Sequence, residues 1–282
     1  MIDKCKILII TLIAGIFVIT AAALPRAANA TQINDRPVHL YVGINMAYAN
    51  YSEPTIGVSH KSTYFPGMVA KIAIEQPAEF AFFSQIQYKY QSGSYDYDGY
   101  IQYLDGSKRS YHDTALPNSK QGGEFIIGSY VGDVLKLFVG MEYENIVDDG
   151  FTASPYFYQR TRDSFYGILG AGAYADFGFH KSLEIMVAAK PMMRSYHDSR
   201  LSDLGGIWAD VPTMHQKQPH GLRFDISAKY RYENLWFQPY FQYTSIGGTK
   251  YDKFCLSNGL CGRISEPENQ TTEIGINMGV WF

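Results

Sequence analysis

The chain has 282 residues, with 24 Lys+Arg against 27 Asp+Glu, so its formal net charge is −3. Apolar residues make up 46% and charged residues only 18%, a composition that excludes a disordered chain. The slight acidic excess argues against a nucleic-acid partner, because nucleic-acid-binding domains usually carry a basic excess. Three cysteines are too few for a disulfide-dense scaffold.

Residues 1–30 have the three parts of a secretory signal peptide. A short basic start at Lys4 and Lys6 is followed by an uncharged apolar run, and the segment ends in Ala-Asn-Ala. We predict cleavage after Ala30, which leaves residues 31–282 as the mature chain. The alternative is an uncleaved anchor helix, because the apolar run is just long enough to span a bilayer.

Cys255 and Cys261 remain in the predicted mature chain, six residues apart in a segment that contains Gly and Asn. An even pair in a secreted chain predicts a local disulfide. A metal site would need further soft ligands nearby, and the sequence has none there, so we expect no metal and no cofactor.

Ten segments of the mature chain alternate between apolar and polar residues with the period of two that strands have. They lie at about residues 40–48, 68–74, 80–90, 125–131, 135–143, 165–177, 185–193, 222–232, 235–243 and 274–282. The segment 165–177 is rich in Gly and Ala, and which of its residues face inward stays open. Most charged residues lie opposite the apolar face: Lys71, Lys89, Lys136, Glu142, Glu144, Glu184, Lys190, Arg194, Arg223, Asp225, Lys229 and Arg231.

The connections between these segments alternate in length. Short ones are predicted near residues 76–78, 132–133, 178–181 and 233–234. Long ones are predicted near residues 51–64, 92–121, 146–162, 198–220 and 247–269. This pattern is typical of an all-β, transmembrane, antiparallel up-and-down barrel with short periplasmic turns, five long extracellular loops and both termini in the periplasm. A soluble β-sandwich also alternates, but its strands are usually shorter and its connections lack this pattern.

The last eleven residues, which end in Trp281-Phe282, resemble the C-terminal strand of bacterial outer-membrane β-barrel proteins. The resemblance implies that Phe282 belongs to the signal recognised by the barrel-assembly machinery. It also implies the outer membrane of a Gram-negative bacterium, with membrane lipid and lipopolysaccharide as partners.

A ten-stranded barrel encloses little more space than its own side chains fill, so we expect a filled, charged interior. Function is then expected mostly in the surface loops, as is common on rigid scaffolds. The leading hypothesis is a surface binding, adhesion or structural barrel with an unknown extracellular ligand. A narrow channel along the inner charges is an alternative.

A second resemblance, at the level of architecture, is to the omptins, which are outer-membrane endopeptidases. That family works with an Asp-x-Asp pair in its second loop and an Asp–His pair in its fourth. Here Asp96 and Asp98 are expected directly after the third strand, and His197-Asp198 opens the predicted fourth loop. The resemblance implies that His197, assisted by a carboxylate, activates a water molecule. The family has Asp-x-His where this chain has His-Asp, so enzymatic and non-enzymatic functions both stay open.

Overall fold

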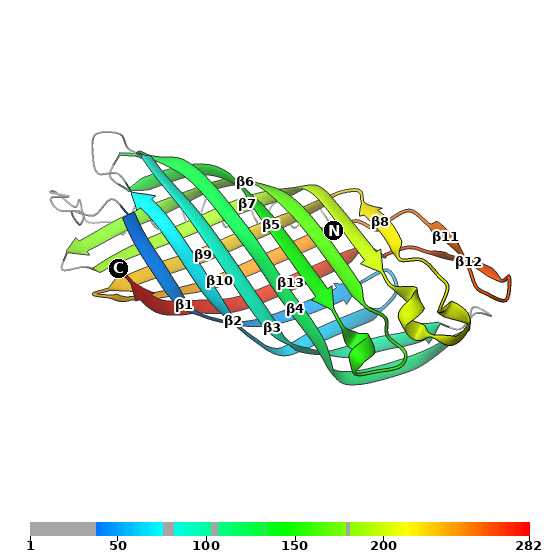
Figure 1. Cartoon of the computed structure of the whole chain (residues 1–282). Helices are drawn as coiled ribbons and strands as arrows, with labels where there is room; N and C mark the ends of the chain where they lie inside the picture. Colours follow the sequence, from blue (N-terminus) through cyan, green and yellow to red (C-terminus); the bar gives the residue numbers. More distant parts are fainter. Residues whose placement is uncertain (1–37, 76–81, 103–106, 133, 179–180) are drawn as a thin grey trace.

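The computed structural model describes residues 38–75, 82–102, 107–132, 134–178 and 181–282. Within these residues, ten long antiparallel strands close into one barrel, as the alternation predicts (Figure 1). The barrel strands are β1 (Val38–Glu53), β2 (Val58–Glu75), β3 (Phe82–Gln102), β4 (Lys108–Val131), β5 (Leu135–Asp148), β6 (Arg160–Gly178), β7 (Lys181–Ser199), β9 (Gly221–Tyr232), β10 (Leu235–Ile246) and β13 (Asn269–Trp281). Each strand pairs with the next along the barrel, and β13 pairs back onto β1, which closes it. The predicted signal peptide lies outside the described residues.

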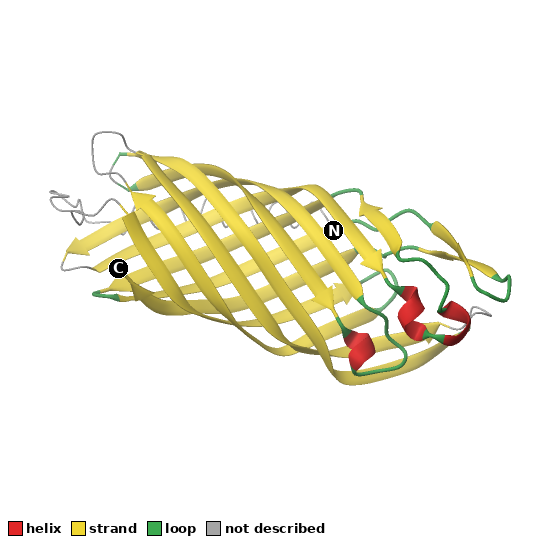
Figure 2. Ribbon diagram, viewed as in Figure 1, coloured by secondary structure: helices red, strands yellow, loops and turns green. Residues whose placement is uncertain are grey.

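The remaining elements gather at one end of the barrel, away from the C-terminus (Figure 2). They are β8 (Met214–Gln218), β11 (Asp252–Cys255), β12 (Cys261–Ile264) and the 3₁₀ helices η1 (Gly150–Thr152), η2 (Leu201–Leu204) and η3 (Gly206–Trp208). We call this end the loop end and the opposite one the terminus end. No helix among the described residues is long and apolar enough to cross a membrane.

The outer surface of the barrel is apolar and its interior is polar. In β5, Val139 is 51% exposed on the outside, whereas Lys136, on the inner face, is 1% exposed. The outward residues of the other strands include Ile44, Met68, Ile86, Leu169, Phe237 and Ile274, all exposed. A soluble sandwich would bury these residues against each other, whereas a barrel in lipid must present them to the hydrocarbon. The arrangement therefore separates the two folds that alternation alone left open.

The first two connections predicted as long loops are instead continuations of the strands. β1 and β2 are separated by residues 54–57, and β3 and β4 by residues 103–107. Beyond the apolar belt the outward positions become polar, because water replaces lipid there, so the apolar alternation fades although the pairing continues. Tyr95 and Tyr97 still alternate inward in this extension and are buried. Among the short turns, the one predicted at residues 233–234 joins β9 to β10 directly.

Arg194 was predicted to face the interior, and the structure corrects this. The pairing of β6 with β7 shifts register between Phe165 and Tyr166, which pair with Arg194 and Met192, so Met193 is an extra residue in β7. A bulge of this kind re-aims the neighbouring side chains. Met193 and Arg194 are therefore both exposed, while Ser195 is buried.

The facing of β6, which the sequence left open, is decided by the same pairing. Tyr166 and Ile168 are buried inside the barrel, while Phe165 and Leu169 are exposed on its outside. Tyr166 packs beneath the Arg223 guanidinium, 4.4 Å from the ring centroid.

Two apolar clusters fill the barrel interior towards the terminus end. One consists of Tyr41, Val69, Ala73, Trp236 and Trp281, and the other of Phe83, Ile126, Phe138, Ile168 and Ala188. Trp236 fits because Gly43 and Gly279 pair across the β1–β13 seam and carry no side chains. A Cβ atom on Gly43 would lie 3.0 Å from the Trp236 ring. The predicted filled interior is thus packed with aromatic rings at this end.

Candidate functional site

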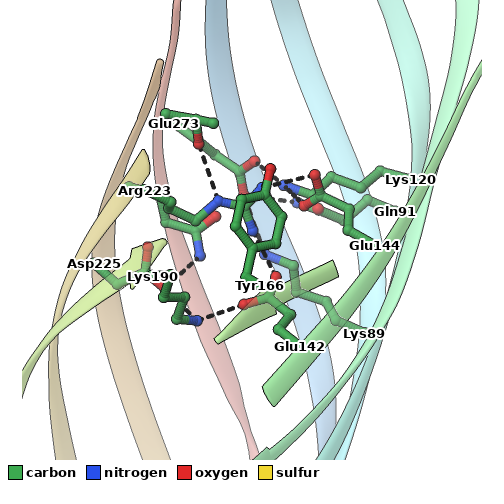
Figure 3. Close-up of polar contacts among 12 residues, drawn as sticks. Lys89, Gln91, Lys120, Glu142, Glu144, Tyr166, Lys190, Arg223, Asp225 and Glu273 are labelled. Carbon is green, nitrogen blue, oxygen red and sulfur yellow. Dashed lines mark hydrogen bonds and ion pairs between the residues drawn. The ribbon is translucent and has the colours of Figure 1, made fainter. Parts of the chain in front are cut away.

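An ionic network occupies the middle of the barrel (Figure 3). Lys190 Nζ lies 2.6 Å from Glu124 Oε2, 2.6 Å from Glu142 Oε2 and 2.5 Å from Asp225 Oδ2. The oxygens of these three carboxylates come close enough to hold a metal ion, but the Lys190 ammonium already supplies the compensating positive charge. The cluster is therefore an ion-pair centre.

The network continues towards the loop end through Arg223. Its Nη1 is 2.5 Å from Glu142 Oε1 and its Nη2 is 2.7 Å from Glu144 Oε1. Lys120 then joins Glu144 at 2.9 Å and Glu273 at 3.0 Å. Figure 3 shows that these side chains come from strands around the barrel and meet in its interior. The charges therefore link the walls of the barrel to one another.

Above this network lies a cavity of about 130 Å³, which we call the loop-end cavity. All ten barrel strands contribute to its lining, including Tyr51, Phe65, Tyr95, Lys120, Asp148, Arg160, Arg162, His197, Arg223, Thr244, Asn269 and Glu273. The lining is charged on several sides, unlike the apolar clusters at the terminus end.

Arg160 is fixed at the wall of the cavity by Asp148. Arg160 Nη2 lies 2.6 Å from Asp148 Oδ2, and Tyr95 donates its hydroxyl to Asp148 Oδ1 at 2.6 Å. The Asp148 carboxylate therefore binds both groups. Burial, together with the negative charge of Asp148, raises the pKa of Tyr95 well above its ordinary value.

His197 faces the cavity from β7 and is buried, with 8% of its surface exposed. Its Nε2 lies 3.2 Å from Glu266 Oε1, and Ser199 donates to the same carboxylate oxygen at 3.1 Å. Burial lowers the pKa of His197, since a charged imidazole loses its hydration there; the Glu266 carboxylate opposes this shift and the guanidinium of Arg160 adds to it. His197 is thus the one predicted catalytic residue that lines this cavity.

The structure places Asp96 and Asp98 within β3, where the sequence predicts them after a strand end. Both alternate with Tyr95 and Tyr97, which are buried, so the two aspartates occupy the other, outward face. Asp96 Oδ1 accepts a hydrogen bond from the backbone N–H of Ala115 at 3.3 Å. The two aspartates therefore do not share a face with His197.

Asp198 is also separated from its sequence neighbour. It lies on the outer face of β7, and its Oδ1 is 2.8 Å from His215 Nδ1 on β8. Adjacent residues of a strand point to opposite sides, so the tripeptide Tyr196-His197-Asp198 cannot form an internal His–Asp pair. The structure does form an Asp–His pair at the loop end, but with His215, a residue that sequence reasoning did not select.

The disulfide is confirmed. Cys255 and Cys261 are bonded and join β11 to β12. At the other end, Phe282 is exposed, and its backbone N–H donates to the Leu40 carbonyl at 2.9 Å. Phe282 thus extends the closing seam of the barrel, while its role in barrel assembly stays a prediction.

Sequence reasoning missed Arg162, because residues 146–162 were expected to form a loop. Arg162 belongs to β6 and pairs directly with His197 of β7. The signal that could have found it is the alternation of Arg160, Arg162 and Ser164, which continues the inner face of the strand beyond the apolar belt.

The chain is similar in fold to several solved outer-membrane barrels. No family model matches the chain, and no curated protein matches it. The outer membrane protease OmpT from Escherichia coli is similar in structure, with a TM-score of 0.56 at 9% identity, over 90% of this chain and 100% of that one. The translocator domain of the autotransporter NalP from Neisseria meningitidis has a TM-score of 0.42 at 11% identity, over 88% and 90% of the chains. Neisserial surface protein A has a TM-score of 0.32 at 13% identity, over 84% and 95%.

Fold and interior together define the class: this is a closed antiparallel β-barrel of the bacterial outer-membrane type. Within that class it is a ten-stranded barrel whose interior holds aromatic clusters at one end, an ionic network in the middle and a polar cavity at the other.

Proposed function

We propose that this protein is a surface barrel of the Gram-negative outer membrane that binds an extracellular partner with its loop end. In this proposal both termini lie in the periplasm and the loop end faces outward. The observation that carries it is the filled interior: aromatic side chains pack the terminus end, and Lys190 and Arg223 bind carboxylates across the middle. Such an interior favours a rigid scaffold over a conduit, so the exposed loop end is left to carry the function.

The packing of the loop end supports a binding function. Tyr95, Tyr97, Leu116 and Val58 form one buried cluster there, and Leu201, Val211, Met214 and Leu256 form another. Large side chains remain exposed on these supported segments: Tyr156 at 57%, Tyr251 at 71% and Leu260 at 57%. Exposed aromatic side chains on a rigid base lose little conformational entropy when they contact a partner.

The outer rim of the barrel suits contact with phosphorylated lipid, including lipopolysaccharide. Arg194 stacks over Tyr196, with 4.5 Å from its guanidinium carbon to the ring centroid, and Lys217 lies opposite Tyr196 on β8. Met193, the chain neighbour of Arg194, is exposed on the same outer surface. Cations at the level where an apolar belt ends attract anionic headgroups.

The test of the proposed function uses the full mature barrel folded in detergent. Its binding to panels of extracellular-matrix proteins and surface glycans is compared with that of Tyr156→Ser/Tyr251→Ser/Leu260→Ser. We expect the wild type to bind at least one panel member and the triple variant to lose most of that binding. The control is Glu233→Ser/Asn234→Ser at the terminus end, which should bind normally. Binding that the triple variant retains in full would contradict a loop-end site.

Measuring conductance across planar bilayers distinguishes a closed scaffold from a narrow channel. We expect no discrete opening steps from the wild-type barrel, because its interior is packed at the terminus end. Steady single-channel steps that respond to Lys190→Ala would instead support the narrow-channel alternative.

An omptin-like endopeptidase is the second candidate, and two observations favour it. The fold is similar to that of a protease, and Asp198 and His215 form an exposed pair at the loop end. Peptide cleavage by the folded protein with added lipopolysaccharide tests this function. Cleavage that is lost in Asp98→Ala/His197→Ala would support the predicted site, and cleavage lost only in Asp198→Ala or His215→Ala would move the site to the outer pair.

A further inference from the structure

We infer that the loop-end cavity is a binding site for a small oxyanion, a carboxylate or a phosphate group, held between Arg162 and His197. This site lies inside the barrel and does not depend on the proposed surface binding. The two residues are direct cross-strand partners on β6 and β7, and both line the cavity. Partners of this kind carry their Cβ atoms about 5 Å apart, so one small group can contact both.

Arg162 differs from the other arginines of the cavity. Arg160 has Asp148 at 2.6 Å, and Arg223 has Glu144 at 2.7 Å. Throughout the described part of the chain, Arg162 has no carboxylate within ion-pair distance, and its guanidinium instead donates from Nη1 to Asn269 Oδ1 at 3.5 Å. Its Nε–H is buried without an acceptor.

A buried N–H such as this Nε–H is costly without an acceptor, because it has lost its hydration and has gained no partner. Planar oxyanions fit a guanidinium best, since two of its N–H groups can bind two oxygens at once. The chemistry of Arg162 therefore points to a carboxylate or a phosphate.

His197 supplies a second group at the same place. Its Nε2 is directed to Glu266, and that distance of 3.2 Å lacks hydrogen-bond geometry. The Glu266 carboxylate accepts a hydrogen bond from Ser199 and lies next to His197, and it is not within ion-pair distance of Arg162.

The charges of the lining agree with an anionic ligand. Four cations, Lys120, Arg160, Arg162 and Arg223, face three carboxylates, Glu144, Asp148 and Glu273. Each of these carboxylates is already in an ion pair with one of the other three cations. Among these lining cations, Arg162 is the one that has no carboxylate of the described residues within ion-pair distance.

The cavity has room for a small anion. Its volume of about 130 Å³ is well above the roughly 10–15 Å³ that a single water molecule requires. Acetate, inorganic phosphate or the acidic end of a larger molecule would fit.

Isothermal titration of the full mature barrel with acetate, inorganic phosphate and sulfate at constant ionic strength tests this inference. We expect saturable one-to-one binding of at least one of these anions. Arg162→Met should weaken it by about tenfold or more, the loss of a charged hydrogen-bond donor. Arg109→Met is the matched control, because Arg109 is exposed on the β4 tip outside the cavity, and it should bind like the wild type.

His197→Gln serves as the second variant if Arg162→Met does not fold, and it should also weaken binding. The absence of saturable binding, or equal binding by wild type and Arg162→Met, would overturn the inference. Because these probes are small free anions, loss of surface binding to proteins or glycans would leave this result untouched, and the two proposals fail separately.

Discussion

Phe138 and Val139 are neighbours in β5, yet Phe138 is buried in an aromatic cluster inside the barrel and Val139 is half exposed on its outer surface. In this fold the face that a residue occupies decides whether it meets lipid, water or the packed interior. The same rule separates His197 from Asp198 and places Arg162 opposite His197.

Val139→Arg tests the assignment of the lipid-facing side. An arginine there would bring a charge to the apolar belt, at an expected cost of about 2–4 kcal/mol in the free energy of unfolding. Urea unfolding in phospholipid vesicles measures it. His112→Arg, at an exposed position of the β4 extension, is the control and should change little. A Val139→Arg barrel as stable as the wild type would refute the facing of β5.

Lys190→Met tests the ion-pair centre. The substitution keeps a long side chain but leaves Glu124, Glu142 and Asp225 close together without their cation. Breaking a buried ion pair on one side usually costs about 3–5 kcal/mol, and we expect a loss of that size in the same unfolding experiment. Lys217→Met, on the exposed face of β8, should cost about 0.5 kcal/mol or less. Equal losses in both variants would mean that the network does not stabilise the barrel.

The stability of the loop end should vary with pH, and His197 should be the source of this variation. Burial lowers its pKa in the folded state, with Glu266 and Asp148 opposing and Arg160 and Arg162 adding to the shift. The unfolded state therefore takes up a proton first as the pH falls below about 6.5, so stability is lost from there down through the folded-state pKa. Hydrogen exchange of the loop end of β7 at pH 7.5 and 5.5 measures this loss. His197→Gln should show a smaller difference between the two pH values, and an identical difference would exclude His197 as its source.

Among the elements, several strands extend beyond the residues whose apolar alternation predicted them. β3 and β4 continue well past the lipid belt, and their inner positions there hold Tyr95 and Leu116. The sequence predicts the membrane part of each strand, because lipid demands an apolar residue at every second position. It does not predict the extension, where water accepts almost any outward residue and only the inner face alternates. Asp96 and Asp98 were expected in a loop for this reason.

The β11–β12 hairpin is an element whose order we expect to depend on its disulfide. The bond closes a short ring, and the chain-entropy model gives about 2 kcal/mol for a ring of this size. Reduction should therefore speed protease cleavage within Asp252–Ile264 and leave the unfolding of the barrel unchanged, because the hairpin forms its own two-stranded sheet. Limited proteolysis with mass analysis, with and without reductant, measures this. A barrel destabilised by reduction would contradict such local independence.

At the scale of the whole molecule, closure is the decisive event. β1 and β13 are at opposite ends of the described chain, and twelve residue pairs join them. Only closure removes the free strand edges that lipid does not tolerate, and it brings the inner charges of all strands into one enclosed space. Stability, cavity and network therefore belong to the closed barrel and to no single hairpin.

The predicted signal peptide is tested on the full-length protein expressed in cells. Protein recovered from the outer-membrane fraction of an expressing Gram-negative host should begin at Thr31. N-terminal sequencing and intact mass measure this, with Ala28→Leu/Ala30→Leu as a control in which processing should slow. A recovered chain that retains residues 1–30 would instead support the anchor-helix alternative.

The ten barrel strands, the facing of most of their residues, the disulfide and the barrel fold could all be predicted from the amino-acid sequence. These features depend on local alternation, whose period of two comes from the geometry of each strand. Three features required the folded structure: Arg194 points outward, Lys190 binds three carboxylates, and Arg162 lies beside His197 in the wall of one cavity. The physical reason is register: a single bulge at Met193 reverses the facing of the residues beyond it. Some inner ion pairs, such as Lys120 with Glu273, join strands far apart in the chain, and only barrel closure brings these strands together.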